Sequence, residues 1–461
     1  MPSDSSFSTH HSPLPTTQKP IIIVGGGITG LSAAWELQGQ GVPYVLLEAS
    51  DYLGGKVETT LTEDGFLIEK AADAFILGKP YAAQLAREVG LEAEVSHPRQ
   101  DTKKLYFLRG GKLLDFPENL KMFVPLDDES FRASGVLSPE GTERFLDEVN
   151  VPPKPPTDED ESLASFVIRR FGEEALNFIV PMAAGIYVAN PYELSMKAAF
   201  PQFLKMEQDY GSLIRGSRAT PKASGHIFMS FRGGMGAFAQ AIASKLTGDV
   251  RLNTPVLRVH SGSVTLAGGE ELAASGVIVA VPAWYAAPML GDFAEASSLI
   301  GALKVNSSVA VTLSYRAADI PFDMNMHGLL VDASEGVALK AMTVHSAKLH
   351  GRAPEDHVLV RCFFVGLEPS VARRQAMAEV ERLLGATGEP LNHWYGDWRG
   401  KNPAYQVGHL EQVAQIFAAL PPNVRVAGAS YTGVGIPDCV NAGRTAARAL
   451  AEQIKAAQAL A

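Results

Sequence analysis

Apolar runs near the N-terminal end of the chain predict two strands of a buried parallel sheet. Ile21–Val24 is a run of β-branched residues that stops at a glycine cluster, and Tyr44–Leu47 is a second apolar run that stops at Glu48. Strands without a polar face are typical of parallel sheets, because helices cover both sides of such sheets. Residues 31–38, between the two runs, have helical character. The pattern therefore predicts a strand, a glycine turn, a helix and a second strand, in that order.

Similar patterns predict further elements along the chain. Residues 276–282 begin as another apolar run, which indicates another parallel strand. Residues 79–89 carry apolar side chains at helical spacing and stop at Gly90, a residue that favours the end of a helix. Strands are also expected at 254–259, 308–315, 358–366 and 424–428, and helices at 237–246, 370–384 and 440–457.

The order of these elements predicts an α/β (α+β) protein. The chain length predicts two or three domains, because 461 residues are too many for a single hydrophobic core. An apolar strand, a turn and a helix occur near the start of the chain and again near its end, and this recurrence predicts a discontinuous Rossmann-like domain. Residues 1–19 are rich in Ser, Thr, Pro and His, which predicts a disordered N-terminal extension. The expected boundaries are 20–96, 226–300 and 395–461 for the Rossmann-like domain, 97–225 for a mainly helical insert and 301–394 for a substrate domain with a mixed sheet.

The glycine cluster has the spacing of a dinucleotide-binding turn. Gly25, Gly27 and Gly30 stand at G-x-G-x-x-G positions between the first strand and the helix. The first glycine permits the tight turn, the second lets a pyrophosphate approach the backbone, and the third lets the helix lie close to the strand. The helix N-terminus offers free N–H groups to the pyrophosphate. Glu48, at the end of the second strand, can accept hydrogen bonds from a ribose diol.

A second glycine turn, Gly54-Gly55-Lys56, follows Glu48 closely. A nicotinamide domain has no need of such a turn at this position. The combination resembles the family of FAD-dependent amine oxidases, carotenoid desaturases and porphyrinogen oxidases, in which this turn lies under the FAD phosphates. The resemblance therefore implies FAD as the cofactor.

Composition excludes several other classes of protein. The 40 basic and 50 acidic residues give a net charge of −10, which argues against nucleic acid and against strong attraction to anionic lipid. The two cysteines, Cys362 and Cys439, lie far apart and without metal-ligand spacing, so neither a disulfide framework nor a metal site is expected. No apolar run reaches the length that spans a membrane.

Three further stretches narrow the resemblance. The first covers residues 160–201, including Arg169-Arg170-Phe171-Gly172 and Pro181-Met182-Ala183-Ala184-Gly185. The second is Trp398 followed by residues 403–409, and the third is the turn at residues 431–439. Together they resemble the oxygen-dependent protoporphyrinogen oxidase family, whose bacterial branch includes the coproporphyrinogen III oxidases.

The resemblance implies an FAD-binding domain of the para-hydroxybenzoate hydroxylase type, a substrate domain and a helical domain that contacts the membrane in some relatives. The chain departs from the family at Lys70-Ala71-Ala72-Asp73-Ala74, where relatives carry Arg-Gly-Pro-Asp-Ser, and this departure puts the backbone path near the flavin in doubt. A basic pair of the bacterial relatives is reduced here to Lys79, a candidate partner for a substrate propionate. The implied FAD contacts are Gly25, Gly26, Gly27, Ile28, Thr29, Gly30, Glu48, Ala49, Gly54, Gly55, Lys56, Ala71, Ala72, Asp73, Ala74, Val256, Trp398, Val434, Gly435, Ile436 and Pro437.

The expected function is oxidation of coproporphyrinogen III or protoporphyrinogen IX to the porphyrin in haem biosynthesis, with O2 as acceptor and H2O2 as product. The pattern of residues names no catalytic base, and His345, His357 and His409 are interpreted as structural. An FAD-dependent amine oxidase and a non-catalytic flavin-binding partner of neighbouring haem-pathway enzymes stay open as alternatives.

The cellular location and the choice of substrate are the remaining expectations. We expect a cytoplasmic protein with peripheral contact to the membrane at most. Coproporphyrinogen carries four carboxylates and protoporphyrinogen two, so additional cations in the pocket would favour the former. Which of Lys79, Arg215, Arg218 and Lys222 reach the substrate pocket stays open.

Overall fold

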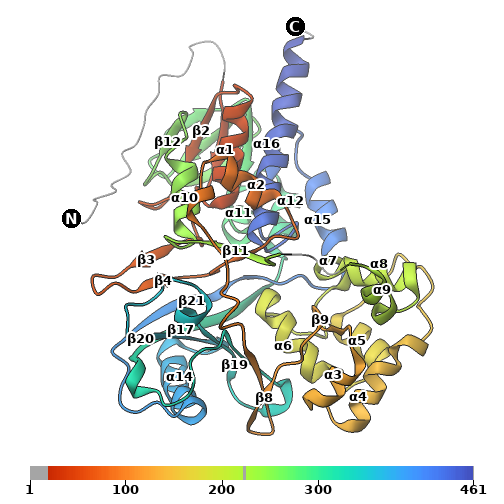
Figure 1. The fold of residues 1–461 in the computed structure, drawn as a ribbon. Helices are drawn as coiled ribbons and strands as arrows, with labels where there is room; N and C mark the ends of the chain where they lie inside the picture. Colours follow the sequence, from red (N-terminus) through yellow and green to blue (C-terminus); the bar gives the residue numbers. More distant parts are fainter. Residues whose placement is uncertain (1–18, 222–224, 460–461) are drawn as a thin grey trace.

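The computed structural model describes residues 19–221 and 225–459. The predicted extension at 1–19 lies outside the described residues except for Lys19, and Lys222 lies outside them too. Figure 1 shows an upper part that contains both ends of the described chain and a lower part made of a second sheet and a group of helices.

Within the described residues, the upper part is built on a parallel five-stranded sheet with the order β12-β2-β1-β16-β22. All residues of β1, β2 and β16 are buried, as their apolar sequences predict. The strands come from three separate stretches of the chain and pair in register, with Ile21 beside Tyr44 on one side and Gly276 on the other. Their bounds are β1 Ile21–Val24, β2 Tyr44–Leu47, β12 Asp249–Arg251, β16 Gly276–Val279 and β22 Val424–Val426.

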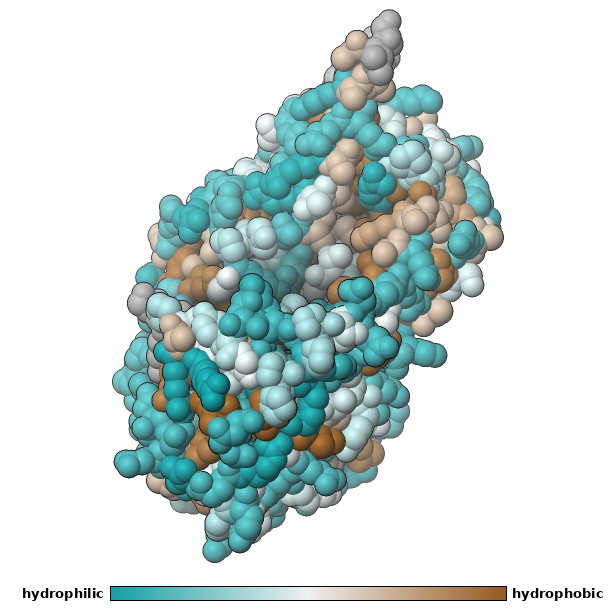
Figure 2. Space-filling view, turned by 90° about the vertical axis from the view of Figure 1, so that its right-hand side faces the viewer, coloured by the Kyte–Doolittle hydropathy of each residue, from teal (hydrophilic) through white to brown (hydrophobic). Residues whose placement is uncertain are grey.

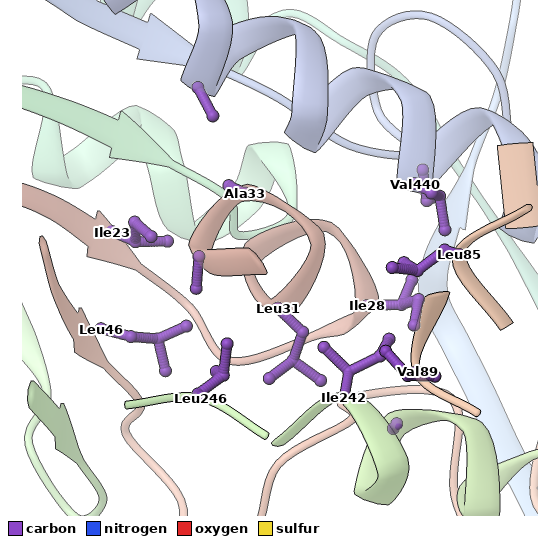
Figure 3. Close-up of a cluster of buried hydrophobic side chains, with 14 of the residues drawn as sticks. Ile23, Ile28, Leu31, Ala33, Leu46, Leu85, Val89, Ile242, Leu246 and Val440 are labelled. Carbon is purple, nitrogen blue, oxygen red and sulfur yellow. The ribbon is translucent and has the colours of Figure 1, made fainter. Parts of the chain in front are cut away.

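Alternate residues of these strands enter two different cores. Ile21 and Ile23 face a core that includes Leu31 and Val440, whose central side chains Figure 3 shows. Ile22 and Val24 face a second core on the other side of the sheet. The helices of the first core are α1 (Ile28–Gly39), α2 (Tyr81–Glu88), α10 (Gly236–Ala243) and α16 (Ile436–Ala459). The second core is formed with α11 (Ala283–Met289), α12 (Ala294–Gly301), α15 (His409–Ala418) and the strands β13 (Val256–Val259), β14 (Ser263–Leu266) and β15 (Glu271–Ala273).

Within the described residues, the lower part contains a mixed seven-stranded sheet with the order β21-β17-β20-β19-β18-β7-β8. Its strands are antiparallel except where β18 pairs with β7. The helix α14 (Pro369–Leu384) packs its buried alanines against one face of this sheet. The strand bounds are β7 Leu105–Arg109, β8 Lys112–Asp115, β17 Val305–Arg316, β18 Gly328–Val331, β19 Leu339–Val344, β20 His357–Val365 and β21 Asn392–Pro403, and the short helix α13 spans His345–Lys348.

The rest of the lower part is helical and has its own apolar core. Two basic residues of α5 are ion-paired: the buried Arg170 with the buried Glu148, and the partly exposed Arg169 with both Glu161 and Glu207. These helices are α3 (Asp128–Ser134), α4 (Pro139–Leu146), α5 (Leu163–Phe171), α6 (Ala175–Tyr187), α7 (Met196–Ala199), α8 (Pro201–Tyr210) and α9 (Leu213–Ala219), with the small strands β9 (Leu120–Lys121) and β10 (Val124–Pro125) beside them.

Short strands connect the upper and lower parts. β11 (Phe228–Phe231) pairs with β5 (Phe75–Ile76) and with β6 (Val95–Ser96), while β3 (Thr59–Leu61) and β4 (Leu67–Glu69) form a hairpin-like pair. Figure 2 shows the molecule hollowed where its two parts meet, with apolar residues gathered above the hollow.

The mixed α/β fold class is confirmed, and two segments lie elsewhere than their predicted domain. Residues 105–115, predicted within the helical insert, form β7 and β8 of the seven-stranded sheet. The predicted boundary at residue 395 falls inside β21, which also belongs to that sheet. Both segments owe their place to pairing with strands far away in the sequence, and periodicity within a segment does not report such pairing.

Candidate functional site

The glycine turn after β1 has the geometry that its spacing predicts. Gly25 has a φ of +105°, and its N–H donates to the Leu47 carbonyl oxygen at 2.8 Å. A Cβ on Gly30 would lie 1.9 Å from the Gly25 carbonyl oxygen, so only glycine lets α1 begin this close to the strand. A Cβ on Gly27 would meet nothing within 4 Å. The turn is therefore closed on the protein side and open in front of α1, as a bound pyrophosphate requires. Ile28 and Thr29 follow as the buried first residues of α1.

The carboxylate of Glu48 points at this turn. One of its oxygens accepts the Gly26 N–H at 2.6 Å, and the other accepts the Ser50 N–H at 2.8 Å. Ala49, beside it, is exposed. Because each carboxylate oxygen can accept more than one hydrogen bond, Glu48 is anchored and can still accept from a ribose diol.

The second glycine turn touches the first directly. Gly54 donates its N–H to the Gly26 carbonyl oxygen at 2.9 Å, and the pair Gly27 and Gly54 forms an isolated parallel bridge. A Cβ on Gly55 would lie 3.2 Å from the Cα of Gly27. The two turns thus form one continuous backbone cradle beside Glu48, a shape that fits the two phosphates of a dinucleotide.

Lys56 extends the cradle toward the seven-stranded sheet. Its ammonium group lies 4.9 Å from the centre of the Trp398 ring and donates to the Lys401 carbonyl oxygen. Burial lowers the pKa of Lys56 to about 8. An anionic neighbour, such as a cofactor phosphate or a reduced flavin, would favour the charged form of this lysine.

The loop 70–74 is held by side chains from the other sheet. Arg361 of β20 is buried and donates to the carbonyl oxygens of Ala71 at 2.7 Å and Lys70 at 3.1 Å. The Trp398 indole N–H donates to the same Lys70 oxygen at 2.9 Å. A Cβ on Gly396 would lie 2.4 Å from that oxygen, so β21 is open at the point where the loop crosses it. These contacts, rather than a Gly-Pro pair, determine the backbone path of the loop.

Asp73 anchors the other end of the loop, between the exposed Ala72 and the half-buried Ala74. Its carboxylate lies 2.7 Å from Lys348 and 3.1 Å from His345 Nε2. Although burial opposes ionisation, these two partners hold the pKa of Asp73 well below its ordinary range. Burial also lowers the pKa of His345 to about 4, so its imidazole is neutral at pH 7. His345 is 1 % exposed, and its contact with Asp73 fixes this end of the loop.

Val256 lies beside the end of β2, on a segment that runs along Glu48. The N–H of Thr254 donates to the Glu48 carbonyl oxygen at 2.8 Å, and that of Asn253 donates to the Ser50 carbonyl oxygen at 2.9 Å. The Val256 side chain is buried at the start of β13. This placement is compatible with the predicted backbone contact between Val256 and an adenine.

The C-terminal turn reaches the same region through the packing of two helices. A Cβ on Gly443 of α16 would lie 2.1 Å from the Thr29 carbonyl oxygen, so α16 crosses α1 in backbone contact. The first N–H groups of α16 have no partner within the helix, and they carry a partial positive charge. Val434, Gly435, Ile436 and Pro437 form the turn before α16 and its first residues.

Lys79 lies at the edge of this arrangement. Its side chain is 51 % exposed and forms an ion pair with Asp438, at 2.7 and 2.9 Å to the two carboxylate oxygens. Of the other cations considered for the pocket, Arg215 is exposed on α9 and Arg218 is paired with Asp128. Lys79 is therefore near the predicted flavin turn, with its charge shared with a carboxylate.

The sequence patterns did not identify several residues that hold the parts of the site in place. Arg361, Lys348 and Tyr405 all hold backbone or carboxylate groups of the predicted flavin loops. Arg361 alone offered a signal, because a charged residue inside the otherwise apolar strand His357–Val365 needs a polar partner. Of the three histidines discussed above, His409 is also buried, and its Nε2 lies 2.9 Å from the Tyr431 carbonyl oxygen.

The described residues lack two kinds of feature. They contain no group of three or more His, Cys, Asp or Glu side chains arranged to hold a metal ion. Among their helices, none is both long enough and apolar enough to cross a membrane.

The chain is similar to known proteins over nearly its whole length. It is 31% identical to a coproporphyrinogen III oxidase of Bacillus subtilis, over 93% of this chain and 97% of that protein. It is also 31% identical to one of Propionibacterium freudenreichii, over 93% of this chain and 90% of that protein. A crystal structure from Exiguobacterium sp. 255-15, named provisionally as a protoporphyrinogen oxidase, superposes with a TM-score of 0.82 at 26% identity, over 95% of this chain and all of that one.

The family model described as flavin containing amine oxidoreductase matches residues 28–451, from the start of α1 into α16. The matched region includes every part of the cradle except Gly25, Gly26 and Gly27. The fold, the backbone cradle and this match agree, and the chain belongs to the flavin-containing amine oxidoreductases as an FAD-dependent oxidoreductase.

Proposed function

We propose that this chain oxidises a porphyrinogen, coproporphyrinogen III or protoporphyrinogen IX, to the corresponding porphyrin. The observation that carries the proposal is the 31% identity, over 93% of the chain, to two bacterial proteins named coproporphyrinogen III oxidase. When bound, FAD supplies the acceptor for a hydride that leaves the substrate. The FAD contacts that we propose are the residues of the cradle, the loop 70–74, Val256, Trp398 and the turn 434–437.

The protein residues act mainly by binding and positioning in this proposal. The cradle around Gly27 and Gly54 holds the pyrophosphate, and Glu48 holds the ribose. Lys56 and the N-terminus of α16 place positive charge where a reduced cofactor would gather negative charge. Every hydride that is lost extends the conjugation of the macrocycle and the proton leaves from another atom of the substrate, so the main task at the reacting carbon is positioning. Asp73 is ion-paired with Lys348 and His345 is buried, and both act on the position of the loop 70–74.

We further propose O2 as the electron acceptor. Each two-electron step removes one hydride and one proton from the porphyrinogen. The O2 molecule takes the two electrons and two protons and leaves as H2O2. Three such steps convert a porphyrinogen into a porphyrin, so three molecules of H2O2 are expected for each porphyrin formed.

The choice between the two porphyrinogens depends on cations in the pocket. Coproporphyrinogen III carries two propionates more than protoporphyrinogen IX, and cationic side chains would favour it. Lys79 is the candidate that lies closest to the predicted flavin turn, and it already has a carboxylate partner in Asp438. We therefore propose that Lys79 contributes to substrate binding only when a propionate takes the place of Asp438.

The proposal is tested with the aerobically purified, yellow protein. Freshly reduced coproporphyrinogen III and protoporphyrinogen IX are added in parallel, and porphyrin fluorescence is followed together with O2 consumption and H2O2 formation. Heat-treated protein with free FAD controls for spontaneous oxidation. We expect porphyrin formation above this control and an H2O2 to porphyrin ratio of three.

Other outcomes distinguish between the alternative acceptors and functions. Porphyrin formation without O2 consumption, with an added quinone for example, would replace O2 by another acceptor. Oxidation of amines without oxidation of porphyrinogens would favour the amine oxidase. Bound flavin without any turnover would favour a flavin-binding partner of haem-pathway enzymes, acting in the cytoplasm or at the membrane surface.

A further inference from the structure

The loop that joins β22 to α16, residues 427–435, is braced by one side chain from a distant segment. The Tyr405 hydroxyl donates to the Ala429 carbonyl oxygen and accepts the Gly433 N–H, both at 2.7 Å. Tyr405 is 2 % exposed. A single hydroxyl thus bridges the two ends of a loop that turns directly into the predicted flavin contacts.

The loop needs such a brace because its backbone is intrinsically free. Gly428 and Gly433 have φ values of +124° and +145°, a region that glycine enters without strain and that leaves the unfolded loop many alternatives. A Cβ on Gly433 would lie 2.5 Å from atoms of the Asp438 side chain, so this glycine cannot be replaced by a stiffer residue. Side chains outside the loop can supply rigidity that its glycines do not.

A second side chain supports the first. The His409 ring stacks on the Tyr405 ring with centroids 4.0 Å apart, and its Nε2–H donates to the Tyr431 carbonyl oxygen at 2.9 Å. Burial lowers the pKa of His409 and raises that of Tyr405 well above its usual value. Both rings are therefore neutral at pH 7, and the Tyr405 hydroxyl keeps the proton that it donates to the loop.

Tyr405 is itself fixed by the helical part of the molecule. The Ser195 N–H donates to the Tyr405 carbonyl oxygen at 2.8 Å. Asp160 accepts hydrogen bonds from both the Ser195 hydroxyl, at 2.6 Å, and the Gly408 N–H, at 3.2 Å. The brace therefore connects the helical part to the loop that begins α16.

We propose that Tyr405 is a positioning residue, whose hydroxyl holds the N-terminal end of α16 in the geometry that binds the flavin. The proposal rests on the proposed function, because it takes residues 434–437 as flavin contacts. Gly433 lies one residue before that turn, so a displacement of the Gly433 N–H moves the turn directly. The N–H groups of α16 interact more strongly with the anionic reduced flavin than with the oxidised form, and their position affects both flavin affinity and reduction potential.

The same loop provides a matched control. Tyr431 is fully buried, and within the described residues its hydroxyl has no hydrogen-bond partner. Tyr405→Phe and Tyr431→Phe therefore delete the same atom from two buried rings, and only the first deletion removes the partner of the buried Gly433 N–H and of the partly buried Ala429 carbonyl oxygen.

The experiment compares wild type and both variants as purified holoproteins. Flavin affinity is measured by rebinding FAD to protein stripped of flavin, and the midpoint potential is measured by titration against a redox dye. For Tyr405→Phe we expect FAD binding to weaken by about tenfold, the effect of leaving buried hydrogen-bonding groups unsatisfied, and the potential to become more negative. For Tyr431→Phe we expect both quantities within about twofold of wild type.

Several results would overturn the proposal. One is an equal flavin affinity and potential in all three proteins. Another is a lower melting temperature of flavin-free Tyr405→Phe without any change in flavin affinity, which would make Tyr405 purely structural. If Tyr405→Phe does not fold, His409→Phe keeps the ring stack and loses the bond to Tyr431, and it should shift affinity in the same direction by less. Failure of wild-type protein to oxidise porphyrinogens would reject the proposed function and leave these flavin measurements intact.

Discussion

The two loops that would face the flavin are held in place in opposite ways. The turn at 25–30 is held by its own backbone and the adjoining strand: Gly25 bonds to Leu47, and Gly30 leaves room for the Gly25 carbonyl. The loop 70–74 is held by side chains from nearly 300 residues away, among them Arg361 on Ala71 and Lys348 on Asp73.

The difference teaches why one loop keeps the family pattern and the other departs from it. A turn that depends on the absence of Cβ atoms cannot change its glycines without steric conflict. A loop whose carbonyl groups are held by distant donors tolerates other residues, provided that its donors stay. Ala71 can therefore stand in this loop without a Gly-Pro pair, since Arg361 and Trp398 hold the carbonyl oxygens of Ala71 and Lys70.

The largest effect is expected from a methyl group in the glycine turn. In Gly30→Ala the Cβ would meet a backbone oxygen at 1.9 Å, which cannot move aside, and we expect a loss of more than about 3 kcal/mol in the free energy of unfolding. Gly27→Ala, whose Cβ enters open space, should change it by less than about 1 kcal/mol while impairing FAD binding. Chemical denaturation of the flavin-free proteins and FAD titration measure the two effects. Equal stability of the two variants would contradict this account.

A smaller effect is expected when the distant support of the loop 70–74 is removed. Arg361→Met deletes two hydrogen bonds to the loop and should lower the free energy of unfolding by about 2–3 kcal/mol. It should also weaken FAD binding, because the loop is a predicted flavin contact. Arg132→Met, at an ion pair with Glu143 that is exposed on both sides, is the control, and we expect no resolvable change in its free energy of unfolding. A destabilised Arg361→Met protein with normal FAD affinity would show that the loop does not contribute to flavin binding.

Lys56 lies against Trp398, which holds the loop 70–74, and its burial makes stability dependent on pH. Its folded pKa of about 8 lies below the ordinary 10.5, so between these values the unfolded chain binds more protons than the folded one. The contribution of Lys56 to the free energy of unfolding therefore rises with pH through this window. Below pH 8 the penalty of burying its charge is fully present.

We expect flavin-free Lys56→Met to be more stable than wild type at pH 7, with the difference shrinking from pH 8 toward pH 10. Denaturation at several pH values measures the difference. Lys205→Met, at a lysine 76 % exposed, should show no such narrowing over this range. A constant difference for Lys56→Met would mean that the lysine keeps its charge throughout.

The smallest effect on stability is expected at Lys79, which ties the segment after the loop 70–74 to α16. Because this ion pair is exposed on the lysine side, Lys79→Ala should change the free energy of unfolding by less than about 1 kcal/mol. If Lys79 binds a propionate, the KM for coproporphyrinogen III rises several-fold and that for protoporphyrinogen IX rises less. Steady-state kinetics with both substrates measure the two KM values. An equal change in both would show that Lys79 does not distinguish between the substrates.

Much of the fold could be predicted where a segment carries its own signal. β1, β2 and β16 are apolar on both sides, and they form the centre of the parallel sheet as expected. β21 could not be assigned to its sheet in this way, because Asn392–Pro403 is polar and aromatic without a clear alternation. Its register comes from pairing with β17, which lies about 90 residues earlier.

The candidate site divides along the same line. The sequence alone determined the local parts: the glycines that shape the cradle, the acid that ends β2 and the turn before α16. These follow from sterics and spacing over a few residues. Tertiary structure alone decided that Arg361, Lys348 and Tyr405 would brace the flavin loops. Hydrogen bonds between distant segments depend on how two sheets and a helical core are placed against one another, and no short-range pattern in a chain encodes that placement.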